Sequence, residues 1–381
     1  MTEERAYWLA WSQIPGIGPV LLKRIQQHFS SLANAWIASA AELAAIEGLG
    51  RKSLPAIVEA RSQLVPQQLL EEQCQKYPHF WTPADPEYPR LLWEIPSPPP
   101  VLYYRGQPEL SENQGQTPLI GIVGTRYPTE HGRRWTRKIS TALVQQGFAV
   151  VSGMAAGIDG EAHRSCLEAG GRTLGVLGNG IDLVYPPNHR QLYGQIQQRG
   201  LLLSEYAPGT PPDRGNFPAR NRIIAGLSRA VLVLEAPEKS GALITARYAT
   251  EFGRDVFTLP NSPDIQEARG CLKLIHQGAE IIVHLEELLE MLGTIPRLVG
   301  DQPRLTLEQA RSPAAPPLAL APELAKVLQA INAVPTPFDV IVREAGLNPG
   351  EVSALLLQLE LLELVSQLPG MQYQRIERHL R

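Results

Sequence analysis

The chain has 381 residues, a hydrophobic content of 44% and a formal net charge of -3 at pH 7. This length predicts two to four domains, and the sequence has neither an apolar run of the ~18 residues that a membrane span requires nor a recognisable secretory signal. The three cysteines, Cys74, Cys166 and Cys271, lie far apart, which favours reduced thiols in the cytoplasm over a disulfide framework or a zinc site.

The distribution of charge along the chain is more informative than its sum. Residues 119–236 contain 13 Lys and Arg against 8 Asp and Glu, although the whole chain is acidic. A local basic patch is sufficient to hold phosphates whatever the net charge. Ordinary variation of a solvated surface is the other interpretation, so charge alone leaves nucleic-acid binding open.

Residues 1–75 predict a helical domain that contains two similar turns. Ile-Pro-Gly-Ile-Gly-Pro at 14–19 and Ile-Glu-Gly-Leu-Gly at 46–50 each precede a helical run, as in tandem helix–hairpin–helix modules. Such turns can present backbone N–H groups to a DNA phosphate at the start of a helix. A structural or protein-binding helical cap is equally compatible with the pattern.

The middle of the chain, residues 76–292, predicts an extended α/β domain. A proline-rich lead-in at 76–118 contains one expected strand at 101–104, and helical spans such as 130–146 and 241–252 separate the strands that follow. Strands that alternate with helices indicate a mostly parallel, doubly wound, Rossmann-like sheet covered on both faces. The expected strands are 119–124, 149–152, 173–177, 201–204, 230–234 and 255–259.

Residues 293–322 predict an extended, proline-rich linker. After it, the pattern at 323–333, 337–345 and 349–361 predicts three helices, and 364–374 predicts a hairpin, which together make a winged-helix domain over 323–381. The helix that would read DNA carries Glu351 and Glu360 and almost no basic residue. Base-reading helices normally present Arg, Lys, Asn or Gln, so we favour protein contact over duplex recognition for this domain.

Several glycine turns follow the expected strands, at 121–126, 153–157, 178–180 and 240–241. The carboxyl ends of parallel strands share one edge of a sheet, where backbone N–H groups and helix dipoles favour anions. Neither a Gly-x-x-x-x-Gly-Lys-Ser/Thr loop nor Gly-x-Gly-x-x-Gly is present, so we expect no P-loop ATPase and no standard dinucleotide cofactor.

Four cationic side chains are expected to meet at this edge, namely Arg126, Arg220, Arg222 and Lys239. Three guanidinium groups and one ammonium suit several phosphates better than one small metabolite. Phe217 would supply a ring on which a base can stack. The ordinary interpretation is that the arginines belong to the general surface and that Phe217 fills the core.

An ordered set of motifs resembles the DprA (Smf) family of bacterial DNA-processing proteins over about residues 81–285. The motifs are Gly-Ile-Val-Gly-Thr-Arg at 121–126, Ser-Gly-Met-Ala-Ala-Gly-Ile-Asp at 152–159, Phe-Pro-Ala-Arg-Asn-Arg at 217–222 and Lys-Ser-Gly at 239–241. The resemblance implies a pocket for single-stranded DNA. The matching residues are Gly124, Thr125, Arg126, Gly153, Phe217, Arg220, Asn221, Arg222, Lys239, Ser240 and Gly241.

Two positions depart from the pattern of the family. Asn261 replaces a glycine that follows a proline, and asparagine tolerates left-handed backbone geometry better than most residues. Leu272 stands where the family tends to have asparagine, so no binding role is expected there. Asp159 and His163 are four residues apart and could share a metal, but a helix cap and a buried histidine explain them better, and we expect no metal site.

The resemblance implies a binding protein without enzymatic activity that protects incoming DNA during natural transformation, forms a homodimer through its Rossmann-like domain and loads the recombinase RecA. A sensor or hydrolase for a nucleotide-derived small molecule is the alternative. If Thr245 matches the threonine of phosphoribohydrolase-like proteins, Tyr248 occupies the position of their catalytic glutamate, which argues against hydrolysis. A purely scaffolding protein is the third possibility.

Overall fold

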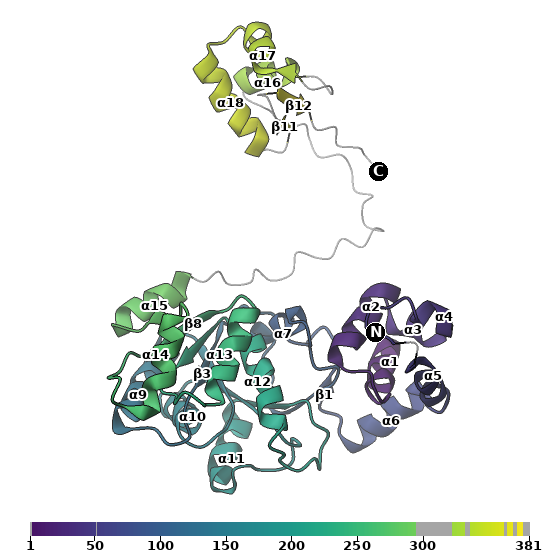
Figure 1. The fold of residues 1–381 in the computed structure, drawn as a ribbon, viewed down its shortest axis with the longest axis vertical. Helices are drawn as coiled ribbons and strands as arrows, with labels where there is room; N and C mark the ends of the chain where they lie inside the picture. The colour runs from purple at the N-terminus through teal and green to yellow at the C-terminus, as the bar shows by residue number, and fades with distance from the viewer. Residues whose placement is uncertain are drawn as a thin grey trace. The chain divides into compact units, whose positions relative to one another are not determined.

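The computed structural model describes residues 2–50, 52–294, 322–331, 336–361, 364–368 and 372–375. The chain divides into two compact units, Met1–Pro303 and Arg304–Arg381, and each is described separately (Figure 1). The boundary predicted near residue 75 falls inside the first unit. In the described part of the chain, no helix is long and apolar enough to cross a membrane.

A nine-stranded sheet in the order β1-β2-β6-β5-β4-β3-β7-β8-β9 forms the centre of the first unit. The strands from β6 to β9 in this order are parallel, and β1 and β2 add an antiparallel edge. The fold class and each of the strands predicted by residue range are confirmed. The strands are β1 (Phe80–Trp81), β2 (Leu102–Gly106), β3 (Leu119–Val123), β4 (Ala149–Ser152), β5 (Thr173–Val176), β6 (Leu201–Ser204), β7 (Ala230–Val233), β8 (Asp255–Thr258) and β9 (Glu280–Ile281).

The direction of winding reverses at β3, which lies between β4 and β7. Gly121 of β3 is in register with Val151 of β4 on one side and with Val231 of β7 on the other. From β3 the chain proceeds through β4 and β5 to β6, and it then returns to form β7, β8 and β9 on the opposite side. The loops after β3 and β7 therefore diverge, which opens a crevice at the carboxyl edge of the sheet.

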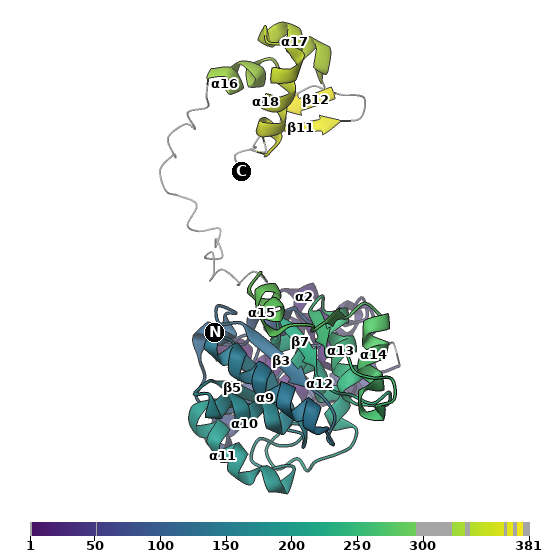
Figure 2. The same ribbon diagram turned by 90° about the vertical axis from the view of Figure 1, so that its left-hand side faces the viewer.

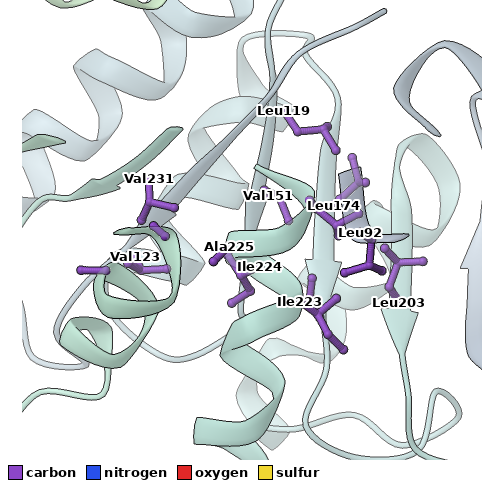
Figure 3. Packing of buried hydrophobic residues seen from close by; sticks show 14 of the residues in the cluster. Leu92, Leu119, Val123, Val151, Leu174, Leu203, Ile223, Ile224, Ala225 and Val231 are labelled. Carbon is purple, nitrogen blue, oxygen red and sulfur yellow. The ribbon is translucent and has the colours of Figure 1, made fainter. Parts of the chain in front are cut away.

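Helices cover both faces of the sheet, because the side chains of the buried strands alternate between two apolar clusters. Ile120 and Ile122 of β3 pack toward α9 (Glu130–Gln145) and α10 (Ile158–Glu168), which lie side by side in Figure 2. Leu119 packs on the other face with α12 (Asn216–Leu227) and α13 (Ala242–Glu251). Figure 3 shows Ile223 and Ile224 of α12 directed into this second cluster.

Shorter elements complete the sheet region. They are α7 (Arg90–Glu94), α8 (Leu110–Asn113), α11 (Arg190–Arg199), α14 (Arg269–His276), α15 (Leu285–Thr294) and the 3-10 turns η1 (Pro187–His189) and η2 (Gln266–Ala268). Leu288 and Leu292 of α15 are buried in the cluster beneath α9. This packing keeps the chain helical through Thr294, slightly beyond the linker boundary predicted at 293; residues 295–321 of that linker lie outside the described residues.

The predicted helical domain consists of α1 (Thr2–Ser12), α2 (Pro19–Phe29), α3 (Leu32–Ile37), α4 (Ala40–Leu43), α5 (Leu54–Ser62) and α6 (Pro66–Lys76). Its two similar turns lie before α2 and α5. Gly16 and Gly48 adopt φ of +84° and +93° in these turns, a conformation that favours glycine. The apolar residues beside these glycines, Ile14, Ile17, Ile46 and Leu49, are all buried in one cluster, so each turn anchors its hairpin in the core.

Two cations attach this helical domain to the sheet region. Lys23 Nζ donates to the carbonyl oxygens of both Trp93 and Ile95 at 2.8 Å, so its positive charge caps the carboxyl end of α7. Arg5 forms an ion pair with Asp85 at 3.1 Å. These contacts pack the helical domain against the sheet region, so that the two form one compact unit rather than independent domains.

The second unit confirms the predicted winged helix. It contains α16 (Pro322–Gln329), α17 (Phe338–Ala345), α18 (Pro349–Leu361) and a small sheet of β10 (Thr336–Pro337), β12 (Gln372–Arg375) and β11 (Val365–Leu368). The centre of the predicted hairpin, residues 369–371, lies outside the described residues. α18 contains no Lys or Arg, in keeping with the absence of a basic recognition helix.

Candidate nucleic-acid interface

A pocket of about 640 Å³ opens where the loops after β3 and β7 diverge, and the first turns of α12 form one of its walls. A smaller cavity of about 60 Å³ adjoins it and shares Arg126, Phe217 and Arg220. Most of the residues predicted from sequence meet here. Gly124, Thr125, Arg126, Phe217, Arg220, Asn221, Ser240 and Gly241 line the main pocket, and Gly153 lines the smaller cavity.

The loop after β3 is held by close backbone packing. A Cβ at Gly124 would lie 2.5 Å from Cγ1 of Ile158, so only glycine fits against the start of α10. The Thr125 N–H donates to the carbonyl of Glu235 at 2.7 Å, and the buried Glu235 carboxylate accepts from the backbone N–H of Thr129 at 2.8 Å. This double attachment to the end of β7 leaves Arg126 exposed at the tip of the loop.

Arg220 is built into the floor of the pocket rather than lying on the surface. It is only 4% exposed, and its guanidinium donates to the carbonyls of Gly153, at 2.8 Å, and Val176. A Cβ at Gly153 would lie 2.7 Å from Nη2 of Arg220 and 2.8 Å from Oδ2 of Asp159. Gly153 is therefore required for the close approach of these two charged groups.

Asp159 is the buried carboxylate that accompanies Arg220. Its Oδ2 accepts from the N–H of Gly153 at 3.1 Å and from that of Ala155 at 3.4 Å. Burial raises the pKa of Asp159 to about 6, although the charge of Arg220 and the N–H groups oppose the increase. Burial likewise lowers the pKa of Arg220 to about 10, and Asp159 opposes the decrease. The floor of the pocket thus combines one cation with one carboxylate that titrates near neutrality.

Phe217 lies within a cluster of stacked groups. Its ring stacks on Tyr185 with centroids 5.4 Å apart, and the Arg126 guanidinium lies 5.9 Å from its centroid. A Cβ at Gly178 would lie 2.6 Å from Cδ1 of Phe217, so this glycine makes room for the ring. Tyr185 and Arg126 thus both contact Phe217, and Arg126 is the exposed member of this stacked cluster.

Arg222 does not line the pocket, because it projects from another side of α12. It is 6% exposed and forms a bidentate ion pair with Glu205, at 2.5 and 2.6 Å, while Nε donates to the carbonyl of Ser97 at 3.0 Å. Residues 217, 220, 221 and 224 share one helix face by their spacing, and residue 222 falls outside it. The expectation that Arg222 presents a free guanidinium to the site is corrected by this pairing.

The loop at 239–241 forms the wall opposite the loop after β3. Asn221 Nδ2 donates to the carbonyl of Gly241 at 3.1 Å, which joins this loop to α12. A Cβ at Gly241 would meet nothing within 4 Å, so open space lies in front of it. Lys239 is exposed in the same loop but does not line the cavity; its contact with DNA stays a prediction.

Among the aromatic and cationic residues that line the pocket, three were not predicted from the sequence: Tyr127, Tyr185 and Arg214. Tyr127 is 84% exposed, next to Arg126. Arg214 is also exposed and stands just before α12. Tyr127 and Arg214 could have been found from the sequence, because both lie next to recognised motifs. Tyr185 belongs to a loop without a motif, and only the fold places it at the pocket.

The remaining candidates have structural partners. His163 is buried, its Nδ1 lies 2.7 Å from Oγ1 of Thr173, and burial lowers its pKa to about 3, while Asp159 faces the glycine turn instead. The described residues contain no group of three potential metal ligands.

Asn261 does not adopt positive φ; its Oδ1 accepts from the Ser262 N–H at 2.8 Å, so the expected left-handed turn is absent. Leu272 lies on α14 and does not line the pocket.

Because Asp159 titrates within the pocket, anion binding should depend on pH. Above pH 6 its carboxylate is mostly charged and repels a phosphate; as the pH falls through 6 it takes up a proton and the repulsion disappears. If a bound phosphate raises the Asp159 pKa by about one further unit, affinity should be about tenfold greater at about pH 5 than at about pH 8. Fluorescence anisotropy with a labelled oligonucleotide measures this, and Asp159→Asn should remove the step. An unchanged step in that variant would assign the titration to another group.

Comparison with known proteins places these features in a family context. The family model for DNA recombination-mediator protein A matches residues 79–293, and that for the DprA winged helix domain matches 311–371. Protein Smf of Synechocystis sp. is 60% identical over 393 aligned residues, which cover 98% of this chain and 99% of that protein. Protein Smf of Escherichia coli is 38% identical and covers 77% of this chain and 76% of its own length.

Two solved structures extend the likeness to three dimensions. The crystal structure of DNA processing protein A from Streptococcus pneumoniae has a TM-score of 0.65 and 34% identity, and covers 76% of this chain and 98% of that one. DNA processing protein A from Helicobacter pylori, described for its single-stranded DNA binding mode, has a TM-score of 0.50 and 31% identity, and covers 56% of this chain and 95% of that one.

Proposed function

Because this chain belongs to the DprA (Smf) family of DNA-processing proteins in recombination, we propose that it binds single-stranded DNA in the pocket between the loops after β3 and β7. Its role is binding rather than catalysis. The likeness to the H. pylori protein, whose structure concerns single-stranded DNA binding, supports this proposal.

The stacked cluster of Tyr185, Phe217 and Arg126 in the lining of the pocket carries the proposal. Arg126 and Arg214 are exposed cations that line the cavity, and Arg126 lies over the ring of Phe217. Proteins that bind single strands combine two features. Cationic side chains hold the phosphates, and aromatic rings or guanidinium planes beside them stack on the bases. In a duplex the base faces are covered by their neighbours, so this cluster favours an unpaired strand.

A competition experiment tests the ligand class. A labelled single-stranded oligonucleotide bound to the full chain is challenged with unlabelled single strand, blunt duplex or mononucleotides. We expect the single strand to compete best, with little dependence on sequence. Equal or better competition by duplex would contradict the proposal.

A nucleotide-derived small molecule is the second candidate, because of Thr245. This residue is 1% exposed and lines the pocket, and its Oγ1 has no hydrogen-bond partner among the described residues. A ligand oxygen would satisfy the hydroxyl. Tyr248 instead stacks on Phe252 at 5.7 Å, and its phenol supplies no carboxylate for hydrolysis. Tighter binding of mononucleotides than of oligonucleotides would favour this candidate.

The finer parts of the proposal come from the family. We assign to the protein the protection of incoming DNA during natural transformation, the loading of RecA and self-association through the sheet domain, all in the cytoplasm. The exposed side chains of Ile281 in edge strand β9 and of Val283 beside it support self-association. A monomer in sedimentation experiments, or no acceleration of RecA filament growth on single strands, would contradict the respective assignment.

A further inference from the structure

The outer surface of α9 carries a basic run that the pocket does not use. Residues 133–138 contain four cations, Arg133, Arg134, Arg137 and Lys138. Two of them are compensated, because Arg133 lies 3.6 Å from Glu130 and Arg137 lies 2.5 Å from Glu161.

The other two cations have no anionic partner within the part of the chain that the structure describes. Arg134 and Lys138 are both exposed, and the ammonium of Lys138 lies 5.0 Å from the ring centroid of Trp135. Being four residues apart, they share one face of α9 and lie about 6 Å apart along its axis. Two uncompensated cations in a row suit successive anionic groups.

These cations border a shallow, widely open groove of about 450 Å³ along α9. Thr141 and Gln145 continue the stripe one and two turns further on, and Leu285 at the start of α15 lines the other side. The first turn of α15 carries Glu286 and Glu287. An anionic chain in this groove would therefore be attracted to the α9 side and repelled from α15.

The groove follows the pocket closely in sequence, although the two have no lining residue in common. α9 begins at Glu130, four residues after Arg126, and its amino end lies at the carboxyl edge of the sheet where the pocket opens. Tyr127, which lines the pocket and is 84% exposed, lies between Arg126 and the start of α9 in the sequence. Arg134 and Lys138 lie about one and two turns from this end of the helix.

We propose that a DNA strand bound in the pocket leaves it over Tyr127 and continues along α9, where Arg134 and Lys138 bind its phosphates. This path rests on the proposed function of the pocket and extends its footprint by the nucleotides that lie on α9. Charge complementarity, together with the position of α9 directly after the pocket loop that carries Arg126, favours the same strand over an acidic protein as the occupant.

Oligonucleotides of two lengths separate the path from the pocket. A strand of about 5 nucleotides fills the pocket alone, whereas one of about 20 nucleotides also reaches α9. Arg134→Ala/Lys138→Ala should leave the affinity for the short strand unchanged. For the long strand at about 0.1 M salt, affinity should fall about 25-fold and the slope of log affinity against log salt should flatten by about 1.4, since two phosphate contacts are lost.

The matched control is Lys76→Ala/Arg199→Ala, which removes one Lys and one Arg exposed at the ends of α6 and α11. It should bind both strands as the parent does. Unchanged long-strand binding in the α9 variant, or an equal loss for both lengths, would overturn the path. Failure of the parent to bind either strand would instead overturn the proposed function on which the path depends.

Discussion

Arg222→Ala should destabilise the first unit by about 3–5 kcal/mol, because it leaves the Glu205 carboxylate without the partner that compensates it in a largely buried site. The same change removes the hydrogen bond from Nε to the carbonyl of Ser97. All six tryptophans, at positions 8, 11, 36, 81, 93 and 135, lie in the first unit. Their fluorescence during urea denaturation therefore measures this unit without interference from the winged helix.

A double variant provides the control for this prediction. Arg222→Met combined with Glu205→Leu removes both charges and retains apolar volume, so it should recover much of the lost stability. If Arg222→Ala instead stayed as stable as the parent and lost affinity for DNA, Arg222 would be a contact residue after all. The stability measurement thus decides between the sequence-based expectation and the observed ion pair.

Arg126→Ala/Arg214→Ala should lower the affinity for single-stranded DNA about 25-fold at about 0.1 M salt, since each phosphate contact contributes about -0.7 to the slope of log affinity against log salt. Both side chains are exposed, so the fold should survive their removal. Titrations at several salt concentrations should show a slope flatter by about 1.4. Arg220 is unsuitable for this test because its removal would leave Asp159 uncompensated.

Two further variants separate charge from geometry at the same site. Arg126→Lys/Arg214→Lys retains both charges, so the salt slope should persist even where the loss of the planar guanidinium weakens binding. Phe217→Ala should cost about 1–3 kcal/mol with almost no change in slope, because stacking releases no counterions. A parental salt slope in the folded Arg126→Ala/Arg214→Ala variant would place the bound strand elsewhere.

Local pattern was sufficient for the elements of this fold. Runs such as Leu-Ile-Gly-Ile-Val at 119–123 are apolar on both faces and are followed by a glycine, here Gly124, which specifies a central parallel strand and then a turn. The helices of the winged-helix domain were also predicted to within a few residues where the structure describes them. Both signals depend on neighbours within a few positions, so no knowledge of distant contacts was required.

The roles of the individual arginines required the tertiary structure. Arg220 and Arg222 are two positions apart and have the same chemistry, yet one helps to form the pocket floor and the other pairs with Glu205. Helical spacing places Arg220 and Arg222 on different faces of α12. The packing of α12 on the sheet then determines that the face with Arg220 meets the pocket. The same holds for Tyr185, which stacks on Phe217 from 32 positions earlier in the chain.

The strands, the helices, the glycine turns and the membership of a recognisable family could be predicted from the sequence alone, because these depend on the order and local spacing of residues. The tertiary structure was needed to show which charged groups face the cavity, which are compensated by partners on other segments, as Arg222 is by Glu205 and Arg220 by Asp159, and where aromatic rings stack. The physical reason is that burial and charge pairing are properties of contacts between segments far apart in the chain, which local pattern does not encode.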